Sequence, residues 1–268
     1  MRETAYAKIN LALHVRERME DGYHRIETVF AFAEDGDEIG VAAGEGLTLD
    51  VAGPFAGELS GEDDNLVLRA ARSLAERCGV RQGAALRLHK RLPVAAGIGG
   101  GSADAAAALR LLNRWWRLGL AEGALLQLAG PLGADVPACL LSRASRGEGR
   151  GDRLFPLADE ALVGTPVLLV NPRVKLSTPA VFGAWNGLGG GPLKSWRDGR
   201  NDLEAAAVRL APEVAEVLRS LAGAPFARMS GSGATCFGLY ESQADRDRAA
   251  AAIAAAHPHW WTLCTRLR

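Results

Sequence analysis

A glycine-rich stretch carries the clearest chemistry in this chain. The segment LPVAAGIGGGSADAAAALRLL, residues 92–112, places four glycines within five residues, directly ahead of an alanine run that predicts a helix. A helix start leaves about four backbone N–H groups without partners and carries roughly half a positive charge. Because glycines let a ligand approach that backbone closely, the segment predicts a phosphate-binding loop at Gly99, Gly100, Gly101 and Ser102.

Two common phosphate-loop patterns do not fit this stretch. A Walker loop needs a lysine that is not present here, and the dinucleotide fingerprint needs a glycine where this chain has Ser102. The structural alternative is a flexible turn ahead of an alanine-rich helix. We predict that Ser102 caps this helix, which runs to about Arg117 with Asp104 in its first turn.

The elements around this loop mix strands and helices without a repeating order. Lys8 and Asn10 share one face of the first strand, and Asp63 or Asp64 is expected to cap a helix that Gly79 ends. Pro212 is expected to divide two helical runs within residues 201–221. The expected strands are residues 5–15, 26–33, 37–41, 47–51, 84–90, 165–171, 227–229, 235–240 and 260–266. This order predicts an α+β fold rather than a doubly wound one.

Composition excludes several classes of protein. The 268 residues contain 31 basic and 31 acidic side chains, so we expect neither a nucleic-acid nor a membrane partner. The N-terminal segment alternates and is charged, unlike a signal peptide. Four cysteines without a CxxC pair predict reduced thiols and a cytoplasmic location. The polar residues 142–151 predict an exposed loop or a boundary between two domains, residues 1–152 and 153–268.

Three motifs resemble those of the GHMP small-molecule kinases. PVAAGIGGGSADAAAA resembles their second motif, AKINLAL at residues 7–13 their first, and MSGSGATCFGLY at residues 229–240 their third. The resemblance implies an α+β, two-domain GHMP kinase fold with mixed sheets and the ATP site between the domains. Three further segments narrow the family resemblance to one branch: GYH at residues 22–24, LGADVPACL and RNDLEAAA. They resemble the GHMP kinases that act on a cytidine-diphosphate-linked methylerythritol. Its 2-hydroxyl would receive the γ-phosphoryl group of ATP, in non-mevalonate isoprenoid (terpenoid) precursor synthesis.

The same resemblance implies roles for individual residues. Asp135, in GADVP, would be the general base, and Lys8 would orient the hydroxyl beside it. The structural alternatives are a loop carboxylate that accepts backbone N–H groups and a lysine on a solvated strand face. The residues implied to bind ATP, besides the loop itself, are Asn65, Leu66, Lys90, Pro93, Gly97 and Ala103.

A stacking clamp is implied for the cytosine of the substrate. Tyr23 would stack on the base, His24 would hydrogen-bond its edge, and Phe182 would form the other half of the clamp. Ordinary core packing is the alternative for Tyr23 and Phe182. The remaining residues implied to contact substrate are Asn10, Thr28, Thr178, Gly231, Ser232 and Gly233. For the last three, a tight turn between two strands is the alternative.

Mg²⁺ is expected as a cofactor because ATP chemistry uses a metal that bridges phosphate oxygens. Ser102 matches one ligand that several relatives use, but no matching glutamate is identifiable, so no metal ligand is predicted. The glycines of residues 185–200 are interpreted as a flexible loop rather than a second phosphate site, and no oligomeric state is predicted. Two other functions stay open: another GHMP kinase of the homoserine or mevalonate type, and a nucleotide-binding relative without turnover.

Overall fold

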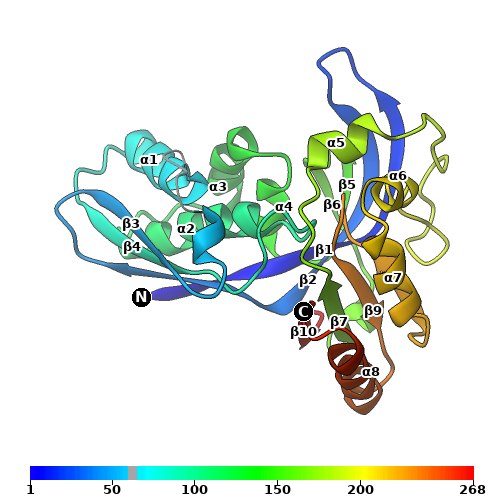
Figure 1. The fold of residues 1–268 in the computed structure, drawn as a ribbon. Helices are drawn as coiled ribbons and strands as arrows, with labels where there is room; N and C mark the ends of the chain where they lie inside the picture. Colours follow the sequence, from blue (N-terminus) through cyan, green and yellow to red (C-terminus); the bar gives the residue numbers. More distant parts are fainter. Residues whose placement is uncertain (60–64) are drawn as a thin grey trace. The chain divides into compact units, whose positions relative to one another are not determined.

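The computed structural model of the protein describes residues 1–59 and 65–268. The described chain packs as two compact units, each built from several separate segments (Figure 1). The first unit contains Met1–Ala7, Asp35–Val94 and Gly99–Ser142, and the second contains Lys8–Glu34, Ala95–Ile98 and Arg143–Arg268. The predicted domains, 1–152 and 153–268, are continuous in sequence whereas these units are not, and that division stays a prediction.

The first unit combines a mixed sheet with helices. Strand β3 runs parallel to β4, and β4 is antiparallel to the C-terminal part of β2, where Glu38 pairs with His89. Helix α1 packs against α2, and α2 packs against α4. The elements are β1 (Arg2–Arg18), β2 (His24–Ala42), β3 (Leu47–Ala52), η1 (Ala56–Leu59), α1 (Leu66–Cys78), β4 (Ala84–His89), α2 (Gly100–Trp115), α3 (Glu122–Ala129), η2 (Gly130–Leu132) and α4 (Val136–Leu141).

The second unit holds an antiparallel sheet in the order β10-β7-β9-β8. In the same unit β5 pairs with the N-terminal part of β2 and with β6. The further elements are β5 (Ser145–Gly149), β6 (Arg153–Pro156), η3 (Glu160–Leu162), β7 (Pro166–Asn171), α5 (Thr178–Gly183), α6 (Glu204–Leu210), α7 (Glu213–Ser220), β8 (Phe226–Met229), β9 (Cys236–Leu239), α8 (Gln243–Ala256) and β10 (Trp261–Arg266).

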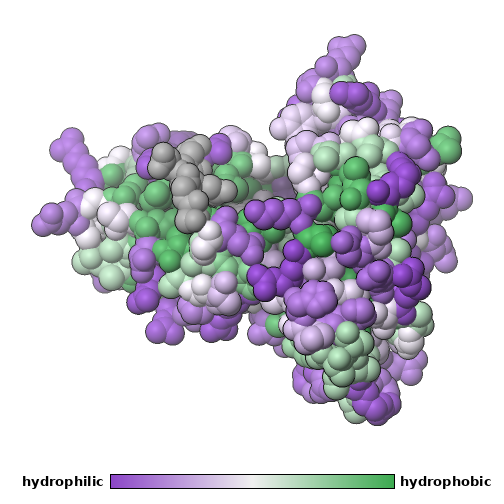
Figure 2. All heavy atoms as spheres, in the orientation of Figure 1, coloured by the Kyte–Doolittle hydropathy of each residue, from purple (hydrophilic) through white to green (hydrophobic). Residues whose placement is uncertain are grey.

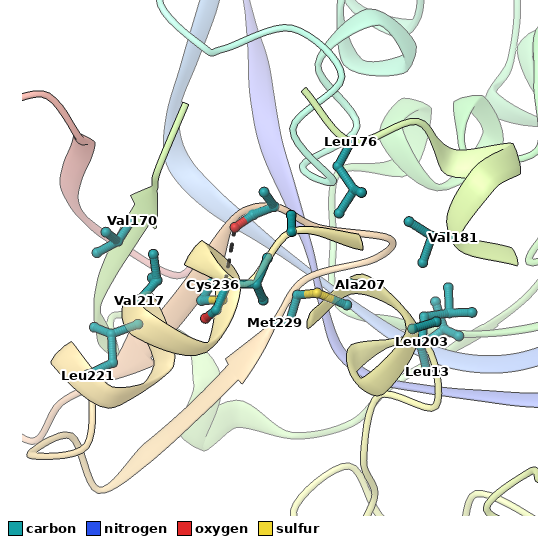
Figure 3. Packing of buried hydrophobic residues seen from close by; sticks show 14 of the residues in the cluster. Leu13, Val170, Leu176, Val181, Leu203, Ala207, Val217, Leu221, Met229 and Cys236 are labelled. Atoms are coloured by element: carbon teal, nitrogen blue, oxygen red, sulfur yellow. Dashed lines mark hydrogen bonds between the residues drawn. The ribbon is translucent and has the colours of Figure 1, made fainter. Parts of the chain in front are cut away.

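The core of the second unit lies between this sheet and the helices that cover it. Figure 3 shows Val170 of β7 and Cys236 of β9 near Val217 and Leu221, at the α7 end of the cluster. Val181 of α5 belongs to the same cluster and is fully buried. Apolar residues at helical spacing on α6 and α7 therefore fix these helices on the sheet.

Most predicted elements are confirmed, and the α+β class with them. The two helical runs on either side of Pro212 are α6 and α7, and Gly79 ends α1 in the left-handed conformation, with φ of 65°. Asn65 caps α1, because its side chain accepts a hydrogen bond from the Val67 N–H at 2.9 Å. The predicted caps, Asp63 and Asp64, lie outside the described residues.

Three predictions about elements are wrong. Residues 26–33 and 37–41, expected as two strands, form one strand, β2, because residues 34–36 continue its pairing with β1, where Gly36 lies against the Ala5 backbone. Ser102 does not cap α2, since the helix already begins at Gly100, after Gly99 with φ of 64°; Asp104 therefore lies beyond the first turn. Residues 142–151 were expected as an exposed loop or a domain boundary; the exposed loop is wrong, since residues 145–149 form strand β5 against β2, whereas the chain does pass from one unit to the other between Ser142 and Arg143.

On the face shown in Figure 2, hydrophilic side chains are interspersed among hydrophobic ones over both units. None of the helices in the described residues combines the length and the apolar character that a bilayer crossing requires.

Candidate functional site

The glycine loop ends in a helix start whose backbone faces outward. Gly100, Gly101 and Ser102 form the first turn of α2 and are half-buried or exposed, so their amide groups are open to a ligand. The Ala103 N–H, in contrast, donates to the Gly99 carbonyl at 2.8 Å, and its side chain is buried. A phosphate site at the first three residues of α2 stays a prediction, and at Ala103 the N–H is already hydrogen-bonded.

Two residues implied to bind ATP lie beside this helix start. Leu66 is the first residue of α1, and its Cδ1 lies 3.6 Å from the position that a Cβ on Gly101 would occupy. Asn65, whose side-chain oxygen caps α1, directly precedes it. The first turns of α1 and α2 thus meet at Leu66 and Gly101. Pro93 is buried, and nothing in the structure gives it a polar role.

Lys90 lies beneath the helix start in a buried charge cluster. Its Nζ donates to Asp37 Oδ2 at 2.5 Å and to Asp104 Oδ2 at 2.7 Å, and all three side chains are at most 3% exposed. A Cβ on Gly100 would lie only 3.0 Å from that Nζ, so a side chain there would press on the ammonium group. The ammonium group of Lys90 is already paired with two carboxylates. A role of Lys90 in ATP binding therefore stays a prediction.

Asp104 has a strongly perturbed pKa in this cluster. Burial raises the pKa of its carboxyl group, Lys90 lowers it, and Asp37 raises it again, which leaves it at about 7. Burial lowers the pKa of Lys90 while the two carboxylates raise it, and the net direction is upward. One oxygen of Asp104, Oδ1, is buried without a hydrogen-bond partner in the described structure.

Asp135 stands immediately ahead of α4, in the same unit as the helix start. It occupies the N-cap position but accepts no capping hydrogen bond from the first turn of α4. The role of Asp135 as general base stays a prediction, beside the alternative of a loop carboxylate that accepts backbone N–H groups. Lys8 belongs to the other unit, so the implied partnership of Lys8 with Asp135 stays a prediction.

In the second unit Lys8, Asn10 and Thr28 form one hydrogen-bonded chain. Lys8 Nζ donates to Asn10 Oδ1 at 2.7 Å, and Asn10 Nδ2 donates to Thr28 Oγ1 at 2.8 Å. Thr28 Oγ1 in turn donates to the Ala12 carbonyl at 2.6 Å. Lys8 is 3% exposed, which excludes the alternative of a solvated strand face. The structure thus brings three residues of the implied site together and fixes the direction of the Lys8 side chain.

Ser230 is a residue of this site that the sequence analysis missed. Its Oγ accepts from the Asn10 N–H at 3.1 Å and donates to the Gly97 carbonyl at 2.9 Å. A Cβ on Gly97, whose φ is 75°, would lie 2.5 Å from the Ser230 carbonyl oxygen. Segments of all three motifs therefore meet at one buried hydroxyl. Its place next to Gly231 in the third motif is the signal that points to it.

The implied base clamp is partly assembled. The His24 ring lies 4.9 Å from the Phe182 ring, and Trp185 meets His24 edge-on at 5.7 Å. Burial and the nearby Arg18 lower the pKa of His24, which favours the neutral ring that can both donate and accept hydrogen bonds. Tyr23 is more than half exposed and is not brought onto Phe182.

Other contacts surround the clamp. The guanidinium group of Arg150 lies 4.2 Å from the Tyr23 ring centroid, and it also pairs with Asp21. Arg150 therefore already covers one face of the Tyr23 ring. Of the other residues implied to contact substrate, Thr178 and Ser232 have their hydroxyls 2.8 Å apart.

Two models of known protein families match this chain. Residues 65–143 match the family described as GHMP kinases N terminal domain, and residues 186–259 match the one described as GHMP kinases C terminal. The two matches together cover more than half of the chain. The chain belongs to the GHMP kinase family.

Relatives within the GHMP kinase family match nearly the whole chain. A 4-diphosphocytidyl-2-C-methyl-D-erythritol kinase from Rhizorhabdus wittichii is 56% identical over 277 residues, which cover 99% of this chain and 94% of the relative. One of the same name from Sphingopyxis alaskensis is 49% identical, and the match covers 100% of this chain and 99% of the relative.

Solved structures of GHMP kinases confirm the fold. A crystal structure of 4-(cytidine 5'-diphospho)-2C-methyl-D-erythritol kinase matches with a TM-score of 0.85 at 34% identity and covers 100% of this chain and 99% of that chain. Homoserine kinase from Cytophaga hutchinsonii matches with a TM-score of 0.71 at 17% identity, covering 98% and 96%. At that lower identity the likeness concerns the fold alone.

A second missed residue of this GHMP kinase lies in the segment RNDLEAAA. Asn201 is buried, and its Nδ2 donates to the carbonyls of Met229 at 2.9 Å and Gly231 at 2.7 Å. It therefore holds the third glycine motif in place. The next residue, Asp202, accepts from the amide groups of Val15 and Gly190, which ties part of the segment 185–200 to β1.

The described residues contain no group of three or more His, Cys, Asp or Glu side chains that could hold a metal ion.

Proposed function

We propose that this chain is an ATP-dependent kinase that phosphorylates the 2-hydroxyl of 4-diphosphocytidyl-2-C-methyl-D-erythritol. The observation that carries this proposal is the 56% identity to a relative of that name over 99% of the chain. The reaction would be one step of the non-mevalonate route to isoprenoid precursors.

The nucleotide phosphates would bind at the first turn of α2. The amide groups of Gly100, Gly101 and Ser102 have no partner within the helix and lie at its positive end. Leu66, which meets Gly101, would line the adjoining nucleotide pocket.

Asp135 would act as the general base. It would take the proton of the 2-hydroxyl while that oxygen forms a bond to the γ-phosphorus, and the bond from this phosphorus to the bridging oxygen would break, so that ADP leaves. Lys8, held by Asn10, would orient the hydroxyl and balance the developing charge. These roles fit a half-buried carboxylate at the start of α4 and a buried ammonium group that donates to Asn10.

His24 and Phe182 would hold the cytosine, and the Tyr23 ring would stack on it. A neutral His24 can offer a donor or an acceptor to the base edge, which matches the lowered pKa of this ring. The cytidine diphosphate group would thereby set the choice of substrate.

Mg²⁺ belongs to the proposal as a cofactor. When bound, it would neutralise charge on the ATP phosphate oxygens, and no protein ligand is assigned to it. A cytoplasmic location is also proposed, and the reduced thiols of Cys78, Cys236 and Cys264 agree with it.

The test is phosphoryl transfer from ATP across a panel of acceptors, measured as ADP release. We expect turnover with 4-diphosphocytidyl-2-C-methyl-D-erythritol and background rates with mevalonate, homoserine and galactose. Comparable kcat/KM for mevalonate or homoserine would favour another GHMP kinase specificity. Absence of turnover with all four acceptors, despite ATP binding, would favour a relative without catalysis.

A further inference from the structure

Arg110 is a partly buried cation in α2 whose contacts reach two other elements. Its Nη1 donates to the carbonyls of Cys139 at 2.8 Å and Leu140 at 3.2 Å. Its Nη2 donates to the Thr4 carbonyl at 2.9 Å and lies 3.5 Å from a carboxylate oxygen of Glu3. The side chain is only 17% exposed, so this arrangement is enclosed by the first unit.

The contacts to Cys139 and Leu140 fall on the last turn of α4. A helix leaves its last carbonyl groups without partners, and a helix of six residues makes few hydrogen bonds of its own. The Ser142 hydroxyl donates to the Cys139 carbonyl at 2.5 Å and accepts from Arg110 at 3.3 Å. A cation at this end also complements the helix dipole. Arg110 therefore supplies hydrogen bonds that α4 cannot supply itself.

The two helices that Arg110 joins carry different parts of the proposed reaction. Helix α2 begins with the glycine loop at Gly100, and Asp135 directly precedes α4. Both helices belong to the first unit and pack against each other. Because α4 has only six residues, a shift of its C-terminal end would also displace Asp135 at its N-terminal end.

We propose that Arg110 is a positioning residue for phosphoryl transfer, which holds Asp135 at a fixed place relative to the first turn of α2. The proposal rests on the proposed function, in which Asp135 is the base. Misplacement of a reacting group by about 1 Å can cost on the order of 100-fold in rate. Loss of Arg110 should therefore lower kcat while leaving the substrate contacts in place.

The experiment compares Arg110→Met with Arg114→Met. Arg114 lies one turn further along α2. Like Arg110 it pairs with Glu3, at 2.6 Å, but this ion pair connects α2 to β1 and not to α4. We expect Arg110→Met to lower kcat by about 10- to 100-fold with KM for both substrates within about twofold. Arg114→Met should keep kcat within about twofold. Arg110→Lys keeps the charge but cannot bond several carbonyls from one planar group, so its kcat should lie between the two.

A double variant separates positioning from a general loss of structure. In the Asp135→Asn background there is no base to misplace, so adding Arg110→Met should change kcat by less than about threefold. Equal loss of kcat in both backgrounds, or normal kcat in Arg110→Met, would overturn the proposal. If Arg110→Met does not fold, Arg110→Lys is tested in the two backgrounds in the same way.

These outcomes also distinguish the two levels of the argument. If Asp135→Asn alone turns over at nearly the wild-type rate, the role of Asp135 as base fails, and the positioning proposal fails with it. If Asp135→Asn loses turnover while Arg110→Met and Arg110→Lys keep it, only the proposal for Arg110 fails.

Discussion

Asp104 and Asp135 are acidic side chains of the same unit in contrasting surroundings. Asp104 is enclosed with Lys90 and Asp37, and its pKa is raised to about 7. Asp135 is half-buried at the start of α4 and accepts no capping bond there. A group that takes a proton from a substrate must be reachable, so Asp135 suits the role of base and Asp104 does not.

The first prediction concerns Asp135. Replacement by asparagine keeps the size of the side chain but removes the group that accepts the proton, so kcat should fall by about 100- to 10,000-fold. KM for both substrates should stay within about threefold, since the amide retains the shape of the site. Steady-state kinetics measure both parameters. Near-normal turnover in Asp135→Asn would remove this residue from the mechanism.

The second prediction concerns Asp104. Its pKa in the folded protein, about 7, exceeds the usual aspartate value of roughly 4, so the folded state binds this proton more tightly than the unfolded state. The stabilisation by this proton is complete below about pH 4 and is lost as pH rises towards 7. Asp104→Asn has no such proton. Wild type should lose up to about 1.4 kcal/mol per pH unit relative to the variant across that window.

Urea unfolding of both proteins at half-unit steps from pH 5 to pH 8 tests this expectation. Asp50→Asn is the control, because Asp50 is an exposed carboxylate of β3 in the same unit. Its stability should follow that of wild type at each pH. Parallel curves for wild type and Asp104→Asn between pH 5 and pH 7 would show that Asp104 is already ionised there.

At the scale of elements, Ser230 joins three segments that are distant in sequence. Removing its hydroxyl in Ser230→Ala leaves the Asn10 N–H and the Gly97 carbonyl without a partner, at a cost of about 1–3 kcal/mol. Gly97 also directly precedes the segment that enters α2. We therefore expect a lower Tm together with a KM for ATP raised about tenfold.

Thr235→Val is the matched control for Ser230→Ala. Thr235 is also fully buried. Its hydroxyl accepts a hydrogen bond from Asn171 Nδ2 at 2.9 Å, whereas the Ser230 hydroxyl donates to the Gly97 carbonyl. Its loss should lower Tm by a similar amount with KM for ATP unchanged. Thermal unfolding and ATP titrations separate the two effects. The same rise in KM for ATP in both variants would contradict a specific role of Ser230.

The sequence predicts elements well where periodicity and end signals agree. Alternating residues place β1, and Gly79 marks the end of α1, because such local preferences act within a few residues. The exceptions depend on partners far along the chain. Residues 34–36 look like a break between two strands, yet β2 runs through them, because Gly36 lies against the Ala5 backbone of β1, far earlier in the chain.

The site was predictable to a similar extent. The motifs identify Lys8, Asn10 and Thr28, which the structure joins by hydrogen bonds. They do not identify Asn201 or Arg110, because each acts by donating to backbone carbonyl groups of other segments. Carbonyl groups exist at every position, so no residue type in the sequence marks the acceptor.

At the scale of the whole molecule, two strands connect the compact units through the chain itself. β1 runs from Arg2 to Arg18, and it passes from the first unit to the second after Ala7. β2 runs from His24 to Ala42, and the second unit gives way to the first after Glu34. If one part of such a strand unfolded while its other part stayed paired, the junction between the two parts would be strained. The two units should therefore unfold together.

The last prediction tests this coupling by making one cavity in each unit. Leu88 of β4 and Leu168 of β7 are both fully buried, so Leu88→Ala and Leu168→Ala should each cost about 2–5 kcal/mol. Each variant should lower the Tm of one shared transition by several degrees, at roughly 2–4 °C per kcal/mol. Calorimetry and circular dichroism should report the same midpoint. If Leu88→Ala splits the transition and leaves an unchanged high-temperature component, the two units unfold independently, and the shared strands do not couple them.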